Sequence, residues 1–478
     1  MSGIALEYYR NGFHFLSPQV LWGGAGPGYV EMEFPLAPFL TALMFKVFGP
    51  SQWVNEIVPL GCGLGIVWTT YCLGAYLLGS RAAFIAGVVV AAAPNLVMLT
   101  NTGMWADPPM VLAGNLGLYW LVVWAKSDNL RALAAGTTAV ALAILLKLPA
   151  LYLGIPIAYL FLQKYGASCW KQPIAWFSAL GMLLPSLLWY RHANQLYQQF
   201  HNTFGILGAG YLKFGDVETL GHTTFYTSTA RRVALYHLTP LGTLAFLYGL
   251  FVSWRQRQTF LSTWLGSVLL FALVAAGGVW YGHYHYLLPL LPIAALIVGL
   301  GAAELVERAS RHLRDLRWVF AVQAALLVVF LANAVLAGQR FESRDHAFDI
   351  LVWGQKKRTG EVLKSLTQPG DRLIVSDTQM DQVTPETSMT PPDVFYFSDR
   401  HGWYLSVAWL SPARIEELHR QGATHFVVSG NAVADFKAKR NDILGYLDRT
   451  YRRILDDENG IAFALNQPPQ AAAIPAQP

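Results

Sequence analysis

The chain has 478 residues, of which 54% are hydrophobic and only 13% charged, and its mean hydropathy is +0.35. This composition excludes an ordinary soluble domain and favours a core built against lipid. The net charge is +5, but much of the basic excess lies in gaps between apolar segments, where it sets membrane orientation, so we discount nucleic-acid binding. Three cysteines give no disulfide framework.

In chain order, the first predicted element is a helix over residues 36–48, which is too short to span a membrane. It is amphipathic, so we expect it to lie along the outer interface. About ten transmembrane helices follow, near residues 52–78, 80–99, 107–125, 131–147, 149–163, 172–190, 233–253, 259–279, 286–304 and 317–337. The sequence thus predicts an α-helical polytopic membrane protein.

The gaps between these segments alternate in charge. The basic gaps hold Arg81; Lys126 and Arg131; Lys164 and Lys171; Arg255 and Arg257; and Arg308, Arg311, Arg314 and Arg317. By the positive-inside rule these gaps are cytoplasmic. The other gaps hold Glu31 and Glu33, Asp107, Lys147, the stretch from Arg191 to Arg232, and His283 with His285. These face outward, and we expect any chemistry to lie there.

After about residue 340 the pattern changes to that of a small α/β domain exported to the outer side. Strands are predicted at residues 372–376, 394–397, 425–429 and 461–465, with helices near 347–367, 411–421 and 431–450. No Gly-rich phosphate loop follows a strand, so we expect no ATP-dependent role. The predicted domains are an outer loop with the interfacial helix (1–51), a transmembrane domain (52–339), an α/β domain (340–466) and a disordered tail (467–478).

Two outward carboxylates are candidates for chemistry. Glu33 follows a Gly-rich turn and stands just before a helix that begins near Pro35, where the helix dipole favours an anion. Asp107 precedes Pro108-Pro109 at the outer mouth of a transmembrane helix. Each could also be an ordinary acid or cap at a helix end. A functional role is favoured where an ionisable group lies at membrane depth.

The outward cations form a second group of candidates. Lys147 ends a long apolar run, where an ammonium is costly unless it reaches water or an anion, and a lipid-linked phosphate is a natural partner. His283 and His285 could bind a metal, stabilise a phosphate or hydrogen-bond at the lipid headgroups. His192 stands at a helix end, where a cation is favourable anyway.

These fragments carry a family resemblance. The run from Trp22 to Gly49, with Gly-Gly-x-Gly-Pro-Gly-Tyr-Val-Glu-x-Glu-Phe-Pro, resembles the first outer loop of bacterial glycosyltransferases related to the dolichyl-phosphate-mannose protein mannosyltransferases (family 39). These belong to the GT-C class, which includes the lipid A aminoarabinose transferase. The resemblance continues through Asp107, Leu146-Lys147-Leu148-Pro149, Trp189-Tyr190-Arg191-His192-Ala193, His283 to Pro292, and Pro391-Pro392-Asp393-Val394-Phe395-Tyr396-Phe397-Ser398.

The resemblance implies a GT-C fold and a reaction in which a sugar leaves a polyprenyl phosphate and passes to a lipid, glycan or protein hydroxyl at the outer face of a bacterial inner membrane. It implies Glu33 and Asp107 as the catalytic carboxylates, and Lys147, Arg231 and His283 on the phosphate side. Where the aminoarabinose transferase has Lys between its Glu and Pro, this chain has Phe34. Binding of a divalent metal by Glu33 with His192 or His283 is left open, and no paired-ligand spacing supports it.

One departure concerns the principal base of this family, an Asp in the first outer loop. Alignment of residues 7–13 with that loop puts this Asp at or before Met1, and Glu7 is out of register. The first residues should also lie outside, with no helix before them. We therefore expect an N-terminally truncated chain of weak or no activity. The alternatives are a transporter or flippase of a lipid-linked substrate, for which no internal repeat is seen, and a catalytically inactive family member.

Overall fold

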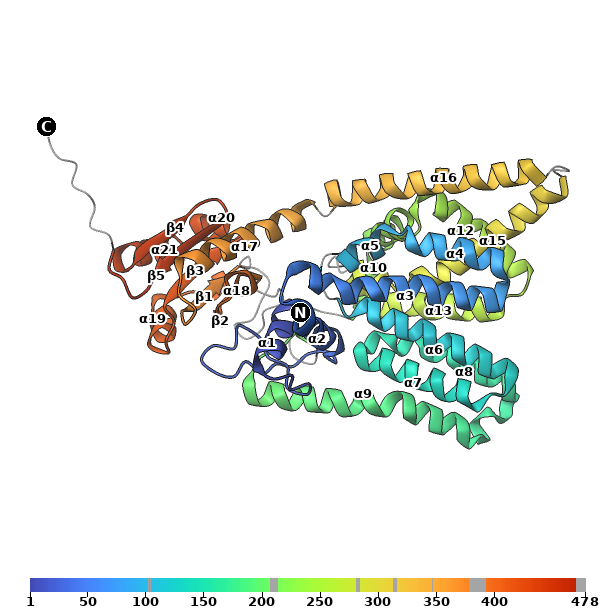
Figure 1. Ribbon diagram of the computed structural model, residues 1–478, viewed down its shortest axis with the longest axis horizontal. Helices are drawn as coiled ribbons and strands as arrows, with labels where there is room; N and C mark the ends of the chain where they lie inside the picture. The colour runs from blue at the N-terminus through green and yellow to red at the C-terminus, as the bar shows by residue number, and fades with distance from the viewer. Residues whose placement is uncertain are drawn as a thin grey trace. The chain divides into compact units, whose positions relative to one another are not determined.

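The computed structural model describes residues 1–101, 103, 105–206, 214–280, 284–312, 316–345, 347–377 and 393–469. It is mostly helical, with a small sheet near the C-terminus (Figure 1). The chain divides into two compact units, which we describe separately. The first combines Met1–Lys46, His192–Gly210 and Arg344–Pro478, and the second combines Val47–Arg191 and Tyr211–Ser343. The domain limits expected from the sequence stay a prediction.

The second unit is a helical bundle. Its longer helices are α3 (Gln52–Leu78), α4 (Ser80–Ala91), α5 (Pro94–Asn101), α6 (Asp107–Ser127), α7 (Leu130–Leu146), α8 (Gly154–Tyr165), most of α9 (Pro173–Phe200), α11 (Thr223–Arg232), α12 (Thr239–Arg255), α13 (Thr259–Val274), α15 (Leu290–His312) and α16 (Leu316–Arg340). Short helices complete it: η1 (Leu148–Leu153), η2 (Gly166–Lys171), α10 (Val217–Gly221), the π-helix η3 (Val233–His237), α14 (Ala276–Trp280) and η4 (Tyr284–Leu287).

Helices occupy each of the predicted spans, but several are broken. The predicted helix 80–99 consists of α4 and α5, which meet at an angle of 54°, because Pro94 cannot continue the hydrogen-bond ladder of α4. The predicted helix 149–163 begins as the 3₁₀ turn η1 before α8. Helix α9 runs ten residues beyond its predicted end at residue 190. Helix α11 with η3 meets α12 at 106°.

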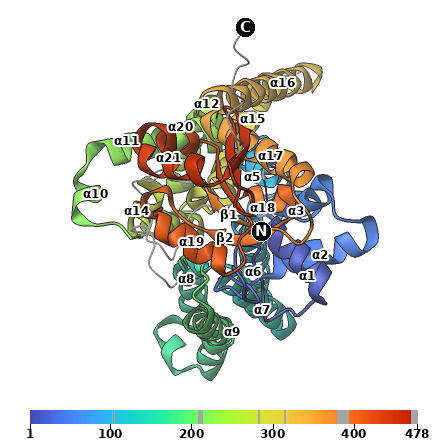
Figure 2. The ribbon, with the colours of Figure 1, turned by 90° about the vertical axis from the view of Figure 1, so that its left-hand side faces the viewer.

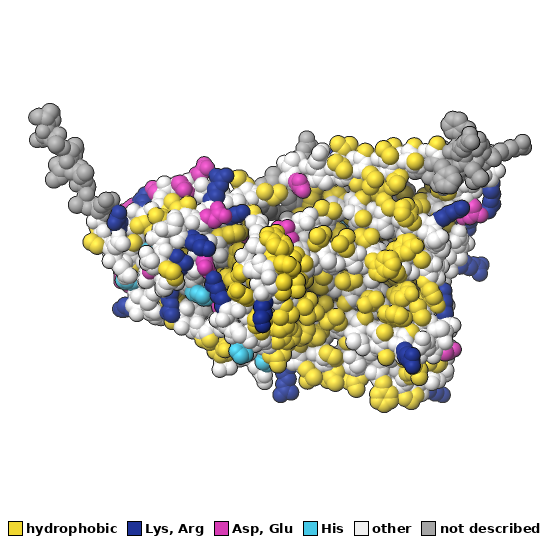
Figure 3. Space-filling view, in the orientation of Figure 1, with side chains coloured by type: hydrophobic (Ala, Val, Ile, Leu, Met, Phe, Trp, Pro, Cys, Tyr) yellow, Lys and Arg dark blue, Asp and Glu magenta, His cyan; other side chains and the backbone are white. Residues whose placement is uncertain are grey.

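Several of these helices suit a bilayer. In the described part of the chain, four are long and apolar enough to cross a membrane, and six if each bent pair counts as one span. A span of 21 residues such as α6 is about 30 Å long, which matches the hydrocarbon core. Hydrophobic side chains cover most of the flank of the helical part in Figure 3. The chain is therefore a multi-pass membrane protein.

Basic residues of helices α6 and α8 lie at the same end of this bundle. Lys126, in the last turn of α6, lies 4.8 Å from the ring centre of Tyr76 near the end of α3. Lys164, near the end of α8, forms an ion pair with Asp128 and lies 5.1 Å from the ring centre of Trp124. The helix ends therefore sort by charge within the bundle, as the alternating gaps predict.

The first unit contains a five-stranded sheet in the order β2-β1-β3-β5-β4. Strands β1 (Arg372–Ser376), β2 (His401–Tyr404) and β3 (His425–Ser429) are parallel, whereas β5 (Gly460–Ala464) is antiparallel to β3 and β4 (Arg452–Asp456) is antiparallel to β5. The helices of this unit are α1 (Ser2–Asn11), most of α2 (Leu36–Phe48), α17 (Ala347–Leu366), α18 (Asp393–Ser398), η6 (Val407–Trp409), α19 (Pro412–Arg420), α20 (Ala432–Lys439) and α21 (Asn441–Thr450). A π-helical turn, η5 (Phe341–Asp345), precedes α17 and crosses the limit between the units.

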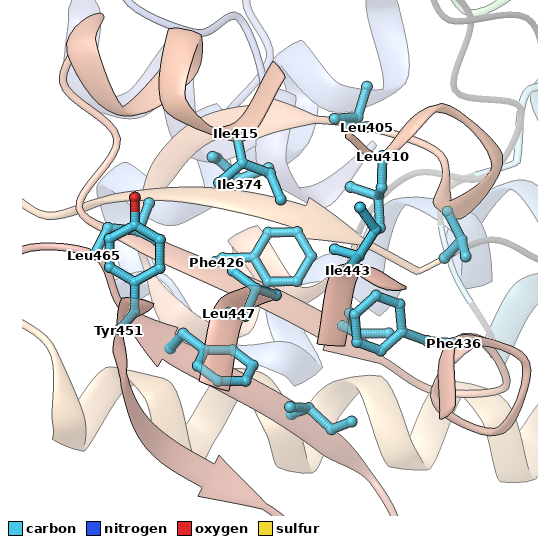
Figure 4. Packing of buried hydrophobic residues seen from close by; sticks show 14 of the residues in the cluster. Ile374, Leu405, Leu410, Ile415, Phe426, Phe436, Ile443, Leu447, Tyr451 and Leu465 are labelled. Carbon is cyan, nitrogen blue, oxygen red and sulfur yellow. The ribbon is translucent and has the colours of Figure 1, made fainter. Parts of the chain in front are cut away.

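Helices cover both faces of this sheet, because alternate residues of each strand point to opposite sides. Ile374, Phe426 and Phe463 pack with side chains of α19, α20 and α21 (Figure 4). Leu373 and Val427 point the other way and pack with residues of α17 and α18. This is the predicted α/β domain.

The sequence prediction is wrong at several places in this domain. Residues 394–397 form helix α18 rather than a strand, with Val394, Phe395 and Ser398 buried on one side. Strands β2 and β4 are not predicted, since β2 has only four residues and β4 is the polar edge strand Arg-Arg-Ile-Leu-Asp. The predicted helix 431–450 is two helices that meet at Arg440. Helix α1 is also not predicted.

The Gly-rich outer loop joins the edge of the sheet next to β2. The amide of Gly24 donates to the carbonyl of Gly402 at 2.7 Å, and the amide of Gly402 donates to the carbonyl of Leu21 at 3.0 Å. Gly24 has φ +69°, and a Cβ there would lie 2.5 Å from Nε1 of Trp403. The loop therefore needs glycine at position 24, because its backbone packs against the indole ring of Trp403. This glycine serves the packing of the loop.

We expect Gly24→Ala to destabilise the first unit by roughly 1–3 kcal/mol, since both the backbone conformation and the space disfavour a side chain. The apparent Tm of the purified chain should fall by several degrees. Gly354→Ala in α17 is the control, because nothing lies within 4 Å of a Cβ there, and it should leave Tm equal or higher. Equal Tm values for parent and Gly24→Ala would contradict the packing described.

A buried charge cluster lies beyond the end of β1 in this unit. The Nζ atom of Lys356 is 3.1 Å from Oδ2 of Asp377, and both side chains are buried. Burial raises the pKa of Asp393, in the first turn of α18, to about 6; the Lys356 ammonium opposes this rise and the Asp377 carboxylate adds to it.

The raised pKa gives a pH dependence with a definite sign. Because folded Asp393 holds its proton up to about pH 6, whereas the ordinary value is 3.8, its stabilising contribution is full below about pH 4 and is lost as pH rises through 6. Asp393→Asn should remove this loss, so the Tm difference between variant and parent should grow from pH 4 to pH 6 and stay level above. A Tm difference that is independent of pH would contradict the raised pKa.

Candidate functional site

The sequence places Asp107 at the start of α6 for a local reason. Pro108 and Pro109 fit the first turn of a helix, where their missing N–H groups have no intrahelical partner to lose. Asp107 stands in that turn, yet its residue is only 1% exposed. A carboxylate buried this deeply needs a cation or several donors.

Lys147 lies where α7 ends. Its amide donates to the carbonyl of Ala143 at 3.1 Å, its φ of −160° leaves the helical region, and Pro149 follows in the 3₁₀ turn η1. The ammonium therefore projects from a break in the chain rather than from a regular helix face. The residue is 8% exposed.

Close packing of α6 on α7 brings these two residues together. At Gly117 of α6 a Cβ would lie 2.6 Å from Val140, and at Gly136 of α7 a Cβ would lie 2.7 Å from Leu121. The helices can approach this closely only because both positions are glycine. Nζ of Lys147 consequently donates to Oδ2 of Asp107 at 2.7 Å, forming a buried ion pair.

An aromatic ring lies against the ammonium. The ring centre of Tyr286 is 5.0 Å from Nζ of Lys147, at the distance of a cation–π contact. Phe271 stacks on Tyr286, and a Cβ at Gly278 would lie 3.2 Å from the same ring. Tyr286 is not among the residues predicted from the sequence. Its contact with Lys147 depends on the fold, and no local sequence signal indicates it.

His285 lies close to this pair. Its ring centre is 4.9 Å from that of Trp105, two residues before Asp107, and 4.9 Å from that of Tyr286. The residue is 8% exposed. His283, the predicted phosphate-side residue, lies outside the described residues. The site therefore combines Asp107, Lys147 and Tyr286 with a histidine close to them.

Arg231 lies in the last turn of α11, and its side chain is exposed. The neighbouring Arg232 donates from Nη1 to the carbonyl of Val279 at 2.7 Å, so it ties α11 to α14. Arg232 at the end of α11 thus serves in part to hold neighbouring helices in place. A phosphate role for Arg231 stays a prediction.

The acidic loop residues belong to the first unit and divide into two kinds. Glu31 is fully buried, and its carboxylate accepts from the hydroxyl of Thr203, so it ties the loop to the segment after α9. Glu33 is partly buried and lies three residues before α2 begins, as expected. Nε2 of His192 donates to the carbonyl of Leu16 at 2.7 Å.

No group of three or more His, Cys, Asp or Glu side chains that could hold a metal occurs among the described residues. His192 already uses Nε2 in a backbone hydrogen bond. The metal site predicted at Glu33 with His192 stays a prediction, and we derive no step through a metal. The predicted alternative ligand, His283, is not among these residues.

The helical unit thus holds a buried ammonium beside one carboxylate and one aromatic face. An ammonium is a group that can donate to a phosphate oxygen. Because water is scarce around it, an anion would be held more strongly there than at the surface. The carboxylate of Asp107 fixes the ammonium in place.

Comparison with known proteins bears on the family and the fold. Residues 32–190 match the sequence model of the dolichyl-phosphate-mannose-protein mannosyltransferase family. No curated protein sequence matches the chain. ArnT from Cupriavidus metallidurans in the apo state has a similar structure, with a TM-score of 0.66 and 13% identity over 98% of this chain and 94% of that one. The same protein bound to undecaprenyl phosphate gives a TM-score of 0.64 at 12% identity, with the same coverage of both chains.

A more distant similarity connects the chain to archaeal oligosaccharyltransferases. AglB from Archaeoglobus fulgidus, in complex with an inhibitory peptide and a dolichol-phosphate, matches with a TM-score of 0.52 and 11% identity over 100% of this chain and 70% of that one. The chain has a GT-C fold. The resemblance inferred from the sequence is therefore confirmed by the family match and by the fold of the whole chain.

In this GT-C bundle the ion pair should contribute strongly to the stability of the helical unit. We expect Lys147→Met and Asp107→Leu each to destabilise the protein by roughly 3–5 kcal/mol, because each leaves a buried charge without its partner. The double variant should lose much less than the sum of the two. Apparent Tm values of all four proteins give this coupling. Additive losses would show that the pair does not form.

Proposed function

We propose that this chain is a membrane glycosyltransferase that moves a sugar from a polyprenyl-phosphate donor to a hydroxyl of a lipid, glycan or protein. The observation that carries the proposal is the buried Lys147 ammonium, paired with Asp107 and lying against Tyr286, in a bundle of GT-C fold. Two of the similar proteins were crystallised with undecaprenyl phosphate or dolichol-phosphate. A lipid phosphate is an anion that reaches the protein from within the membrane. At that depth a charged side chain such as that of Lys147 is costly in free energy unless an anion lies close to it.

The reaction divides into three tasks. The bond between the anomeric carbon and the phosphate oxygen breaks, and its electron pair stays on the phosphate. The acceptor oxygen forms the new bond to that carbon, and its proton passes to a carboxylate. A cation at the phosphate lowers the barrier because it stabilises the charge that develops on the leaving group, and the carboxylate acts as general base.

Lys147 is the residue that we assign to the leaving phosphate. Its partner Asp107 lies 2.7 Å from the ammonium and orients it. Arg231 and His283 are further candidates on the phosphate side. Glu33 is the proposed loop carboxylate that helps to hold the acceptor, and this role rests on the sequence resemblance.

The proposal includes an orientation. The basic helix ends around Lys126 and Lys164 would face the cytoplasm, and the end with Asp107 and Lys147 would face outward. We therefore propose a bacterial inner-membrane protein that acts at the periplasmic face, with the sheet-containing unit on the same side.

The bundle contains a matched control for Lys147. Lys164 likewise forms an ion pair with a carboxylate, that of Asp128, and its Nζ atom lies 5.1 Å from the ring centre of Trp124. This second set lies at the basic end of the bundle. We expect Lys147→Gln with Asp107→Asn to lower sugar transfer from a radiolabelled polyprenyl-phosphate sugar by on the order of 10²–10³-fold. Lys164→Gln with Asp128→Asn should change it less than about twofold, since surface pairs contribute little.

Both double variants replace an ion pair by a neutral polar pair, so a similar Tm and a monodisperse elution profile would separate chemistry from folding. Full transfer by a well-folded Lys147/Asp107 double variant would refute the assignment of Lys147. Uptake of the labelled lipid into vesicles without transfer would instead favour the transporter reading. Neither uptake nor transfer, with intact binding of the donor lipid, would favour an inactive family member.

A further inference from the structure

A pocket of about 240 Å³ opens beside the edge of the sheet in the first unit. Helix α19 lies next to β2 in both Figure 1 and Figure 2, and the pocket is formed between these elements. Its lining is Trp403, Tyr404, Leu405, Trp409, Arg414 and Leu418. Three aromatic residues and one arginine around a single hollow match the usual lining of a ligand pocket, which combines hydrophobic and aromatic side chains with a few polar groups.

The walls of this pocket are held by hydrogen bonds that do not involve its aromatic rings. Arg440 donates from Nη1 to the carbonyl of Val407 at 2.7 Å and from Nη2 to that of Leu410 at 2.6 Å, which fixes η6 and so the backbone of Trp409. The hydroxyl of Ser411 accepts from the amide of Arg414 at 3.1 Å and caps α19. The pocket is therefore preformed rather than created by a ligand.

The exposed groups of the pocket combine flat apolar faces with planar polar groups. Trp409 is 49% exposed, although an indole of this size is normally buried or at an interface. Nη1 of Arg414 lies 2.6 Å from Oε2 of Glu417, and both side chains are 45% exposed. A sugar ring has an apolar C–H face, which packs on an indole, and a rim of hydroxyls, which hydrogen-bond a guanidinium or a carboxylate.

A peptide is a poorer fit to the same place. An extended peptide would bind by adding a strand to the open edge of β2. That edge is already covered, since Gly24 donates to Gly402 and Gly402 donates to Leu21. Side-chain recognition in the pocket would remain, without the main-chain hydrogen bonds that give such complexes most of their affinity.

We propose that this pocket binds a pyranose ring of the acceptor, with the ring face on Trp409 and its hydroxyls toward Arg414. The inference rests on the proposed function, because a transferase that takes its donor from the membrane needs a separate place to hold its acceptor. The ring can come from a glycan or from a sugar-containing lipid headgroup. The chemistry that Trp409 and Arg414 recognise is the same in both cases.

The test measures binding of defined sugars to the full chain in lipid nanodiscs. The probes are α-mannobiose, a phosphorylated glucosamine disaccharide and a Ser/Thr-containing peptide, and the readout is calorimetry together with saturation-transfer NMR. We expect Trp409→Ala to weaken binding of at least one disaccharide by about tenfold, and Arg414→Gln by about fivefold. Trp353→Ala on α17 and Arg449→Gln on α21 replace other exposed Trp and Arg side chains of this unit and should leave the Kd unchanged.

The outcomes separate this inference from the proposed function. In a transfer assay, Trp409→Ala should raise the KM for the acceptor while donor binding and kcat stay near the parent values, which a folding defect would not do. Absence of saturable sugar binding by the parent chain, an equal loss in the controls, or binding of the peptide alone would overturn the inference. Loss of donor binding or transfer in the Lys147/Asp107 double variant tests the proposed function and is independent of Trp409.

Discussion

The buried ion pair between Asp107 and Lys147 is the constraint on which the helical unit depends. Two opposite charges lie in an apolar bundle, 2.7 Å apart and nearly without solvent. Apolar residues of the same size would stabilise the fold as well as such a pair, or better. Retention of the buried pair is therefore explained best if it fixes the helix register or takes part in chemistry. The pair forms because glycines let α6 approach α7 and because α7 ends at Lys147, and the aromatic ring of Tyr286 lies against the ammonium.

The same bundle contains a comparison that separates structure from function. Lys164, Asp128 and Trp124 repeat the set of cation, carboxylate and ring, but Asp128 is 82% exposed, whereas the side chain of Asp107 is 2% exposed. The exposed set needs no explanation beyond helix capping and a basic membrane flank. Burial of both members, rather than the presence of an ion pair, is what marks the Asp107 end as the candidate site.

Periodicity and charge predict most of this fold, but not the contacts between distant segments. The apolar spans, the helix at residues 36–48 and strands β1, β3 and β5 were predictable, because each has a strong local pattern. Residues 393–398 were misassigned because a short apolar run is compatible with a strand or a helix. At the site, Asp107 and Lys147 were named from burial cost alone. Their partnership, and the places of Tyr286 and His285, depend on how α6, α7 and η4 pack, which no local pattern encodes.

The first unit is built from segments that lie far apart in the chain, and this affects how the protein folds during synthesis. Glu7 lies 3.2 Å from His401, 394 residues away in the chain, and the Gly-rich loop completes its hydrogen bonds only with β2. During synthesis the outer loop must therefore wait for almost the entire membrane bundle to be inserted before its partner strand exists. Contacts this far apart in sequence form slowly, and their partners stay exposed meanwhile. Biogenesis of this protein thus includes a long interval in which the Gly-rich loop is unprotected against proteases and against incorrect pairing.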